Sequence, residues 1–341
     1  MMKDQESLLC SFLEGWETKE GIRVFTSGST GAPKEILLTG RQIRRSARRT
    51  NNFFNIGKNS RVHSAVSFEY IGGKMMIARS LVSGCELTFS TPSLNPIPPA
   101  HGTPVNLMSV VPAQMPHIIE NLNEFNHVEN FLLGGSAIDD RLWDKIVQAG
   151  IKAWESYGMT ETASHVALRR VVGPSSRRPF FVPLPGISIK LDFEDCIHIC
   201  DEDIIVVTND IARMDPHGNF EILGRRDDII NTGGIKVLPH EIESILAPYI
   251  SDFAEAFYIT SEKDEIWTSR IVLVLVPKEK YLLNEAGDVL SRVRNIIDTL
   301  PEELIPRKKR PKTIRLANSL PYTSSGKLDR KKLPNEASTI F

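Results

Sequence analysis

One stretch near the start of the chain carries its strongest chemical signal: Phe25-Thr26-Ser27-Gly28-Ser29-Thr30-Gly31-Ala32-Pro33-Lys34. Glycines let the backbone turn its N–H groups toward one point, and such a concavity binds oxyanions. The hydroxyls and the lysine ammonium add further hydrogen-bond donors. The stretch therefore predicts a polyphosphate-binding loop, although a Ser- and Gly-rich surface turn would have the same composition. It differs from a Walker A loop because Pro33 stands where that motif has its second glycine.

Downstream of this stretch, apolar runs and amphipathic segments alternate. Strands are predicted at 105–111, 131–133 and 151–154, with helices at 113–124 and 138–149 between them. Such alternation indicates a parallel sheet covered by helices, and ligands bind beyond the carboxyl ends of its strands. Two segments, Gly134-Gly135-Ser136 and Ser156–Glu161, follow neighbouring strands and are predicted to be loops. We expect both to face one cleft.

Short β-rich runs then follow at 187–193, 196–200 and 204–208, separated by turn residues, and predict a small antiparallel subdomain. Cys196, His198 and Cys200 alternate within one of these runs. Their spacing fits one face of a buried strand better than zinc, which needs a fourth ligand and usually shorter cysteine pairs on a turn. We therefore predict a strand here and no metal centre.

Composition limits the class of protein. The chain has 341 residues, a formal net charge of −1 and four cysteines. Near-neutral charge argues against a nucleic-acid partner, and so few cysteines do not form a disulfide framework. No apolar run reaches the length of a membrane span, and the first residues lack a signal-peptide pattern. We expect a cytoplasmic enzyme without a membrane span.

A predicted helix after the glycine-rich stretch carries arginine on one face. The arginines recur at helical spacing, as Arg41, Arg44, Arg45, Arg48 and Arg49. Such a face can bind phosphates, for example those of coenzyme A, or an acidic partner. More often a charged helix face is simply solvated, and we take solvation as the expectation here.

Three distant runs complete a pattern that the glycine-rich stretch begins. They are Ser156-Tyr157-Gly158-Met159-Thr160-Glu161-Thr162, Gly224-Arg225-Arg226-Asp227-Asp228 and Pro321-Tyr322-Thr323-Ser324-Ser325-Gly326-Lys327. In this order the four runs resemble the signatures of the adenylate-forming superfamily, which comprises acyl-CoA synthetases, peptide-synthetase adenylation domains and luciferases. The resemblance extends from about Phe25 to Leu333. It implies an AMP-forming acid–thiol ligase that uses ATP, Mg²⁺ and coenzyme A.

The resemblance also implies roles for the residues around the adenylate. The loop would hold the β- and γ-phosphates of ATP through Thr26, Ser27, Gly28, Ser29, Thr30, Gly31 and Lys34. Tyr157, between Ser156 and Gly158, would stack on adenine, with Gly135 and Ser136 on the opposite side. Thr160 would contact the α-phosphate and Glu161 would bind Mg²⁺.

Further roles fall on the second half of the chain. Asp210 and Arg225 would bind the ribose; Asn209, before Asp210, replaces a family glycine, and asparagine tolerates a left-handed turn. Gly233 and Gly234 would line the pantetheine tunnel. Lys327 matches the catalytic lysine, a fixed cation for the α-phosphate.

The same resemblance implies the domain organisation. We expect an α/β fold with a large N-terminal domain over residues 1–226, built on a mostly parallel sheet and a small antiparallel β subdomain. A hinge at Asp227 would join it to a mobile α+β domain over residues 227–341. Only about two dozen residues precede the phosphate loop, so we expect the large domain to be N-terminally shortened relative to the family.

The acyl substrate is indicated by the run Phe68-Glu69-Tyr70-Ile71-Gly72-Gly73-Lys74-Met75-Met76. It occupies the place where the family builds part of its acyl pocket, and is most similar to the 2-succinylbenzoate–CoA ligases of menaquinone synthesis. Tyr70 and Gly73 would then line the pocket, and Lys74 would bind a second carboxylate. Other acyl-CoA ligases, an enzyme that loads a carrier protein and a non-catalytic adenylate-binding protein remain alternatives, and a homo-oligomer is left open.

Overall fold

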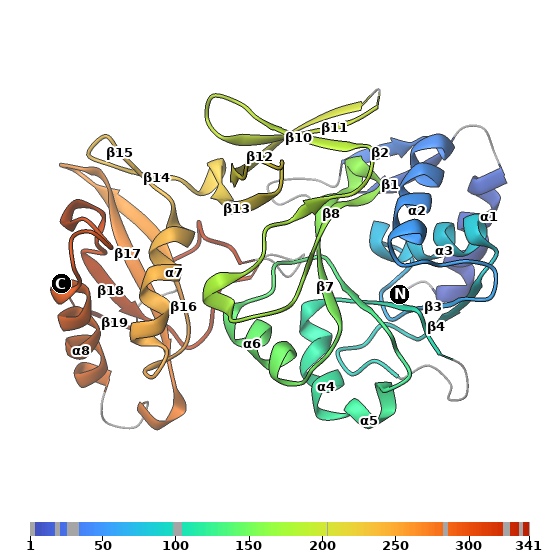
Figure 1. Ribbon diagram of the computed structural model, residues 1–341. Coiled ribbons are helices and arrows are strands. Elements are labelled where there is room, and N and C mark those ends of the chain that lie inside the picture. Colours follow the sequence, from blue (N-terminus) through green and yellow to red (C-terminus); the bar gives the residue numbers. More distant parts are fainter. Residues whose placement is uncertain are drawn as a thin grey trace. The chain divides into compact units, whose positions relative to one another are not determined.

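The computed structural model describes residues 4–17, 21–25, 34–97, 104–202, 204–281, 286–322, 328–333 and 337–340 (Figure 1). Its chain forms two compact units. The first comprises Met1–Lys190, His198–Val206 and Met214–Glu221, and the second comprises Leu191–Ile197, Val207–Arg213 and Ile222–Phe341. The division predicted at residues 226 and 227, and the mobility of the C-terminal part, stay predictions.

A seven-stranded sheet forms the centre of the first unit, in the order β4-β3-β5-β6-β7-β8-β9. Its strands are β3 (Arg61–Ser64), β4 (Glu86–Phe89), β5 (Leu107–Val110), β6 (Phe131–Leu133), β7 (Ala153–Met159), β8 (Ser164–Arg170) and β9 (Val182–Pro183). From β4 through β7 neighbouring strands are parallel, whereas β8 and β9 pair antiparallel. The predicted parallel sheet is therefore confirmed.

Helices lie around this sheet in the first unit (Figure 1). They are α1 (Gln5–Glu17), α2 (Gly40–Phe53), α3 (Ile71–Ser83), α4 (Met115–Glu120), α5 (Leu122–Phe125) and α6 (Asp140–Gln148). Helix α6 shows why the sequence folds this way. The Asp139 side chain accepts a hydrogen bond from the Leu142 N–H, which caps the first turn. Trp143 and Ile146 are buried, and Gly150 follows the helix with φ at +68°.

One predicted loop is instead a strand. Residues 156–159 form the second half of β7 because β8 pairs with them, as far as Met159 opposite Ser164. Only Thr160–Thr162 turns, as one turn of 3₁₀ helix. The prediction was wrong because the partner strand comes later in the chain, so local glycine and hydroxyl content suggested a turn.

Smaller sheets complete the described structure. A hairpin joins β1 (Ile22–Phe25) to β2 (Glu35–Leu38). A four-stranded sheet has the order β10-β11-β12-β13, with β10 (Ile187–Leu191), β11 (Cys196–Asp201), β12 (Ile204–Met214) and β13 (Phe220–Arg225). The strand predicted at Cys196 is thus confirmed.

The C-terminal part of the second unit is an α+β structure. Its elements are β14 (Ile230–Thr232), β15 (Ile235–Val237), α7 (Pro239–Ile250), β16 (Ala254–Asp264), β17 (Thr268–Pro277), α8 (Ala286–Thr299), β18 (Thr313–Leu316) and β19 (Ala337–Ile340). The strands β16, β17, β18 and β19 form one sheet, and both helices contribute buried residues to its core, such as Leu246 and Val293. Pro239 occupies the first turn of α7, where its missing N–H is tolerated.

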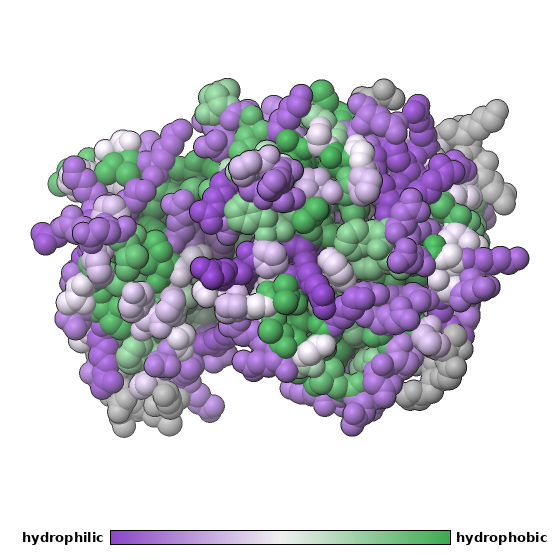
Figure 2. Space-filling model, viewed as in Figure 1, coloured by the Kyte–Doolittle hydropathy of each residue, from purple (hydrophilic) through white to green (hydrophobic). Residues whose placement is uncertain are grey.

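Hydrophilic side chains cover much of the face shown in Figure 2. In the part of the chain that the structure describes, no helix is both long enough and apolar enough to cross a bilayer.

Candidate active site

The carboxyl ends of β6 and β7 bring two predicted motifs together. The Ser156 hydroxyl donates a hydrogen bond of 2.7 Å to the Leu133 carbonyl, at the end of β6. A Cβ on Gly134 would lie 3.1 Å from that hydroxyl oxygen, which explains the small residue there. Gly135, with φ at +92°, and Ser136 follow and are exposed. The two segments therefore lie side by side. That they face one cleft and contact adenine stays a prediction.

The end of β7 is tightly packed. A Cβ on Gly158 would lie 2.2 Å from the Ser164 carbonyl oxygen, so only glycine fits. Tyr157 is 7% exposed, and its ring lies 5.2 Å from that of Phe220 and 6.0 Å from that of Phe181. Aromatic packing thus fixes the tyrosine to which the sequence assigns adenine stacking.

The turn after β7 is held by side-chain hydrogen bonds. The Thr162 hydroxyl accepts from the Met159 N–H at 3.1 Å and lies 2.6 Å from the Ser164 carbonyl. From α2, the Ser46 hydroxyl donates to the Ala163 carbonyl at 2.8 Å, a contact that sequence reasoning missed. Thr160 and Glu161 are half-buried on this turn. Within the described residues the Glu161 carboxylate has no hydrogen bond or ion pair, so its oxygens can take a cation.

A buried ion pair between β7 and β8 was also missed. Arg169 Nε on β8 lies 2.7 Å from Glu155 Oε2 on β7, and Glu155 Oε1 accepts from the Ile138 N–H at 3.0 Å. Burial lowers the pKa of Arg169, and the charge of Glu155 opposes that shift. The pair thereby connects β7, β8 and the segment after Gly135. The sequence signal that could have predicted this pair is a charged residue within each of two apolar strands.

Two residues predicted to bind ribose lie together in the second unit. Arg225 Nη1 is 2.8 Å from Asp210 Oδ1, and Arg225 Nη2 is 3.6 Å from Asp227 Oδ2, the predicted hinge residue. Asp210 is 8% exposed, and its N–H donates to the Thr208 hydroxyl at 3.0 Å. The arrangement offers a carboxylate and a guanidinium side by side, which suits a diol.

Asn209 does not form the left-handed turn expected of it. It lies inside β12, and the positive-φ residues do not include it. Its amide instead contacts the predicted hinge: Nδ2 donates to Asp227 Oδ2 at 2.9 Å, and Oδ1 accepts from Arg226 Nη2 at 2.6 Å. The family glycine has no side chain that could make these two bonds.

Gly233 and Gly234 form the turn between β14 and β15. Their φ angles are +56° and +79°, a region that favours glycine in two-residue hairpins. The Gly233 N–H donates to the Trp267 carbonyl at 2.8 Å, and a Cβ on Gly233 would lie 2.5 Å from the Trp267 ring. Backbone geometry therefore accounts for both glycines, and their place in a pantetheine tunnel stays a prediction.

The predicted acyl-pocket residues lie at the start of α3. Tyr70 precedes the helix and is 58% exposed. A Cβ on Gly73 would lie 2.2 Å from the Ser67 carbonyl oxygen. Lys74 Nζ donates to the carbonyls of Phe68 and Glu69, each at 2.7 Å. Both Gly73 and Lys74 therefore shape this loop, a structural role that the sequence did not indicate.

Several predicted residues lie outside the described part of the chain. They are Lys327 and the phosphate-loop residues Thr26, Ser27, Gly28, Ser29, Thr30 and Gly31. Lys34, at the end of that loop, is exposed next to β2.

The chain is similar to known proteins along most of its length. A model of the family described as "AMP-binding enzyme" matches residues 22–195, more than half of the 341 residues. A 2-succinylbenzoate–CoA ligase of Staphylococcus epidermidis is 25% identical over 92% of this chain and 69% of its own length. The ligase of the same name from a Geobacillus strain is 27% identical over 91% of this chain and 68% of its own length.

Solved structures give the same picture of the fold. An AMP-forming acyl-CoA synthetase/AMP-acid ligase II-like protein from Dyadobacter fermentans is 29% identical, with a TM-score of 0.61, and 97% of this chain aligns with 94% of that one. The AMP complex of O-succinylbenzoate coenzyme A synthetase from Bacillus subtilis is 20% identical, with a TM-score of 0.74 over 94% of this chain and 70% of that one. The chain belongs to the AMP-binding enzyme family and is an AMP-forming acid–CoA ligase.

Proposed function

We propose that the chain activates 2-succinylbenzoate with ATP and transfers the acyl group to coenzyme A, a step of menaquinone synthesis. The observation that carries this proposal is the similarity, over more than nine-tenths of the chain, to ligases of that name. The run around Tyr70 and Lys74, which resembles the same ligases, supports it.

In the first half-reaction a carboxylate oxygen of the acid attacks the α-phosphorus of ATP. The bond to the β-phosphate oxygen breaks, pyrophosphate leaves, and a mixed anhydride with AMP remains. Charge spreads over phosphate oxygens in the transition state, so positioning and cationic stabilisation dominate catalysis. The loop Thr26–Lys34 holds the β- and γ-phosphates, Thr160 contacts the α-phosphate, and Lys327 supplies a cation there. Asp210 and Arg225 fix the ribose.

Magnesium fits at Glu161. Mg²⁺ is usually held by one or two carboxylates together with substrate phosphates. Glu161 has the required hard oxygens on an ordered turn, and the described residues contain no group of three or more metal-ligating side chains. Glu161 would hold the ion, which supplies charge neutralisation at the phosphates.

In the second half-reaction the sulfur of coenzyme A attacks the carbonyl carbon of the adenylate. The thioester forms, AMP leaves with the electrons of the anhydride bond, and the thiol proton passes to solvent. The backbone at Gly233 and Gly234 lines the path of the pantetheine arm. Rotation about Asp227 moves Lys327 away from the adenylate and brings that path to it. The acid itself lies against Tyr70 and Gly73, with Lys74 toward its second carboxylate.

The substrate proposal is tested by ATP–pyrophosphate exchange with a panel of aryl, dicarboxylic and fatty acids. We expect 2-succinylbenzoate to give the fastest exchange, and thioester to form only when coenzyme A is added. Strong exchange with a simple benzoic or fatty acid, and none with 2-succinylbenzoate, would refute the assignment of 2-succinylbenzoate as the substrate. Acyl transfer to a carrier protein in place of coenzyme A would refute the acceptor.

A further inference from the structure

The arginine face of α2 is not simply solvated, contrary to expectation. Arg49 binds Asp201 through two bonds, of 2.8 Å and 2.5 Å, and donates from Nε to the Pro185 carbonyl at 2.9 Å. Arg45 Nε lies 3.0 Å from Asp201 Oδ1, and the Arg45 guanidinium also pairs with Glu202. These two arginines are anchored by carboxylates at the end of β11.

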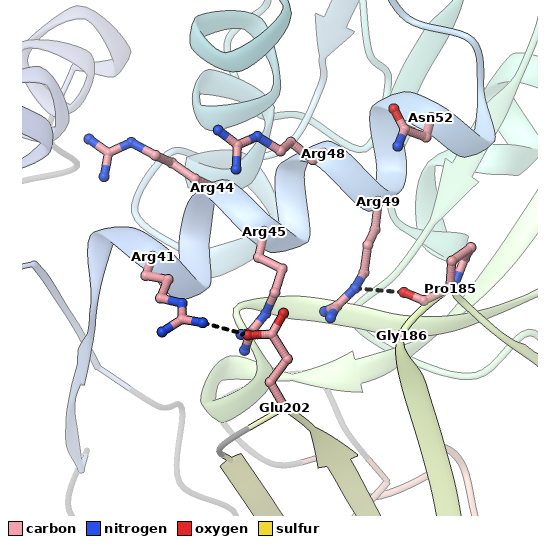
Figure 3. Close-up of a pocket in the computed structure, with 9 residues that line it drawn as sticks. All are labelled: Arg41, Arg44, Arg45, Arg48, Arg49, Asn52, Pro185, Gly186 and Glu202. Atoms are coloured by element: carbon pink, nitrogen blue, oxygen red, sulfur yellow. Dashed lines mark hydrogen bonds and ion pairs between the residues drawn. The ribbon is translucent and has the colours of Figure 1, made fainter.

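The same face borders an open pocket of about 670 Å³ (Figure 3). Its polar lining consists mainly of Arg41, Arg44, Arg45, Arg48, Arg49 and Glu202. Figure 3 shows Arg41, Arg45 and Arg49 extending toward Glu202 and Pro185, while Arg44 and Arg48 extend from α2 away from Glu202. Gly186, at the wall, has φ at +82°, and a Cβ there would lie 3.4 Å from Arg49 Nη2. In Figure 2 the surface over α2, at the upper right, is strongly hydrophilic.

The charges of this pocket do not balance. Five arginines line the pocket, and two carboxylates, those of Asp201 and Glu202, pair with three of them. Arg41 shares Glu202 with Arg45, at 2.9 Å. Among the described residues Arg44 and Arg48 form no ion pair, although Arg44 lies 4.5 Å over the Trp16 ring. Like charges three and four residues apart on a helix destabilise it, so the surplus calls for an anion.

Guanidinium chemistry identifies the kind of anion. Arginine stays protonated at all relevant pH values, and its planar fork binds phosphate through paired hydrogen bonds. A concave pocket of this volume suits a small ligand better than the flat face that a protein partner would use. The surplus of three positive charges matches an oligophosphate rather than a single carboxylate.

We propose that this pocket binds an oligophosphate group, separately from the loop Thr26–Lys34. Its chemical sources include free pyrophosphate and the diphosphate of coenzyme A. Oligophosphate binding at this pocket does not depend on which acid the enzyme activates.

The experiment measures equilibrium binding of radiolabelled pyrophosphate to the full chain at low ionic strength. The test variant is Arg44→Gln with Arg48→Gln, which removes two charges four residues apart without breaking an ion pair between described residues. The control is Arg141→Gln with Lys145→Gln, which removes the same charges at the same spacing from exposed positions on α6. Wild type and control should show a second class of pyrophosphate site that the test variant weakens at least tenfold.

A gain of binding provides a second arm. Glu202→Gln removes a negative charge from the pocket and should strengthen that site severalfold, which a folding defect would not do. Competition by coenzyme A but not by inorganic phosphate would identify the coenzyme as the source. Equal pyrophosphate binding by test and control variants would overturn the proposal. The proposal would also be overturned if binding of a polyglutamate peptide required Arg44 and Arg48 while binding of pyrophosphate did not. That pattern would indicate an acidic protein partner.

Discussion

At the scale of single residues, the contacts around the predicted hinge carry most of the new information. Arg225 lies between Asp210 and Asp227, and Asn209 bonds to both Arg226 and Asp227. The sequence motifs were sufficient to predict Asp210 and Arg225 as partners in one site. They could not predict the role of Asn209, because its amide partners lie 17 and 18 residues away and only folding brings them together.

Asp210→Ala should raise the ATP concentration needed for adenylate formation and leave the dependence on the acid nearly unchanged. A hydrogen bond to a charged group contributes about 1.5–3 kcal/mol, so the loss of one such bond to the ribose weakens ATP binding roughly tenfold or more. ATP–pyrophosphate exchange at varied ATP checks this. An unaltered ATP dependence would show that Asp210 does not bind the ribose.

Asn209→Gly should loosen the predicted hinge. Each lost amide bond is worth about 1 kcal/mol, which corresponds to roughly fivefold more frequent local opening. Trypsin cleavage after Arg225 or Arg226 should accelerate by at least that factor under native conditions. Asn219→Gly, in the turn before β13, is the control. Equal cleavage rates in both variants would show that Asn209 does not restrain the hinge.

At the scale of elements, periodicity predicted most helices and strands, because burial of one face leaves a local pattern. It predicted α6 and its stop at Gly150, the strand at β6 and the helix opened by Pro239. It failed at residues 156–159, where pairing with β8 extends the strand, and at the arginine face of α2, where Asp201 and Glu202 come from a distant hairpin. Patterns local in sequence do not contain such partners.

The buried pair of Glu155 and Arg169 should be important for the stability of the sheet. Arg169→Met leaves Glu155 buried without its cation, and breaking such a pair costs about 3–5 kcal/mol. Urea unfolding should show that loss. Glu155→Gln combined with Arg169→Met removes both charges and should recover a large part of it. If the double variant were no more stable than Arg169→Met, the unpaired charge would not be the cause.

His63, on β3, should make the first unit sensitive to acid. Burial, reinforced by the charge of His127, lowers the pKa of His63 from 6.5 to about 4. Between these pH values the unfolded chain binds a proton that the folded chain does not, so stability falls as the pH drops, by up to about 1.4 kcal/mol per pH unit. His63→Gln should flatten the slope of unfolding free energy against pH between 6 and 4.5. The variant His217→Gln, at an exposed position, is the control. Equal slopes in the two variants would show that His63 does not cause the acid sensitivity.

At the scale of the whole molecule, the four ordered motifs were enough to predict the superfamily and the α/β fold. The match to the AMP-binding enzyme family over residues 22–195 confirms the superfamily. Motif order succeeds because adenylate chemistry requires several separated groups around one ligand, and chance rarely supplies them together. The domain division at Asp227 and its motion depend on how large parts of the chain move, which no local pattern contains, and both remain proposals.

The rates of the two half-reactions, measured separately in the Lys327→Ala variant, test the central claim most directly. Lys327 is proposed to stabilise charge at the α-phosphate during adenylation and to leave before coenzyme A attacks. Loss of a positioned transition-state donor costs about 10²–10³ in rate in a comparable role. On one folded preparation, adenylate formation from 2-succinylbenzoate and ATP should fall by at least that factor. Thioester formation from ready-made acyl-adenylate and coenzyme A should stay close to the wild-type rate. A collapse of both rates together would contradict the two-step, two-conformation account.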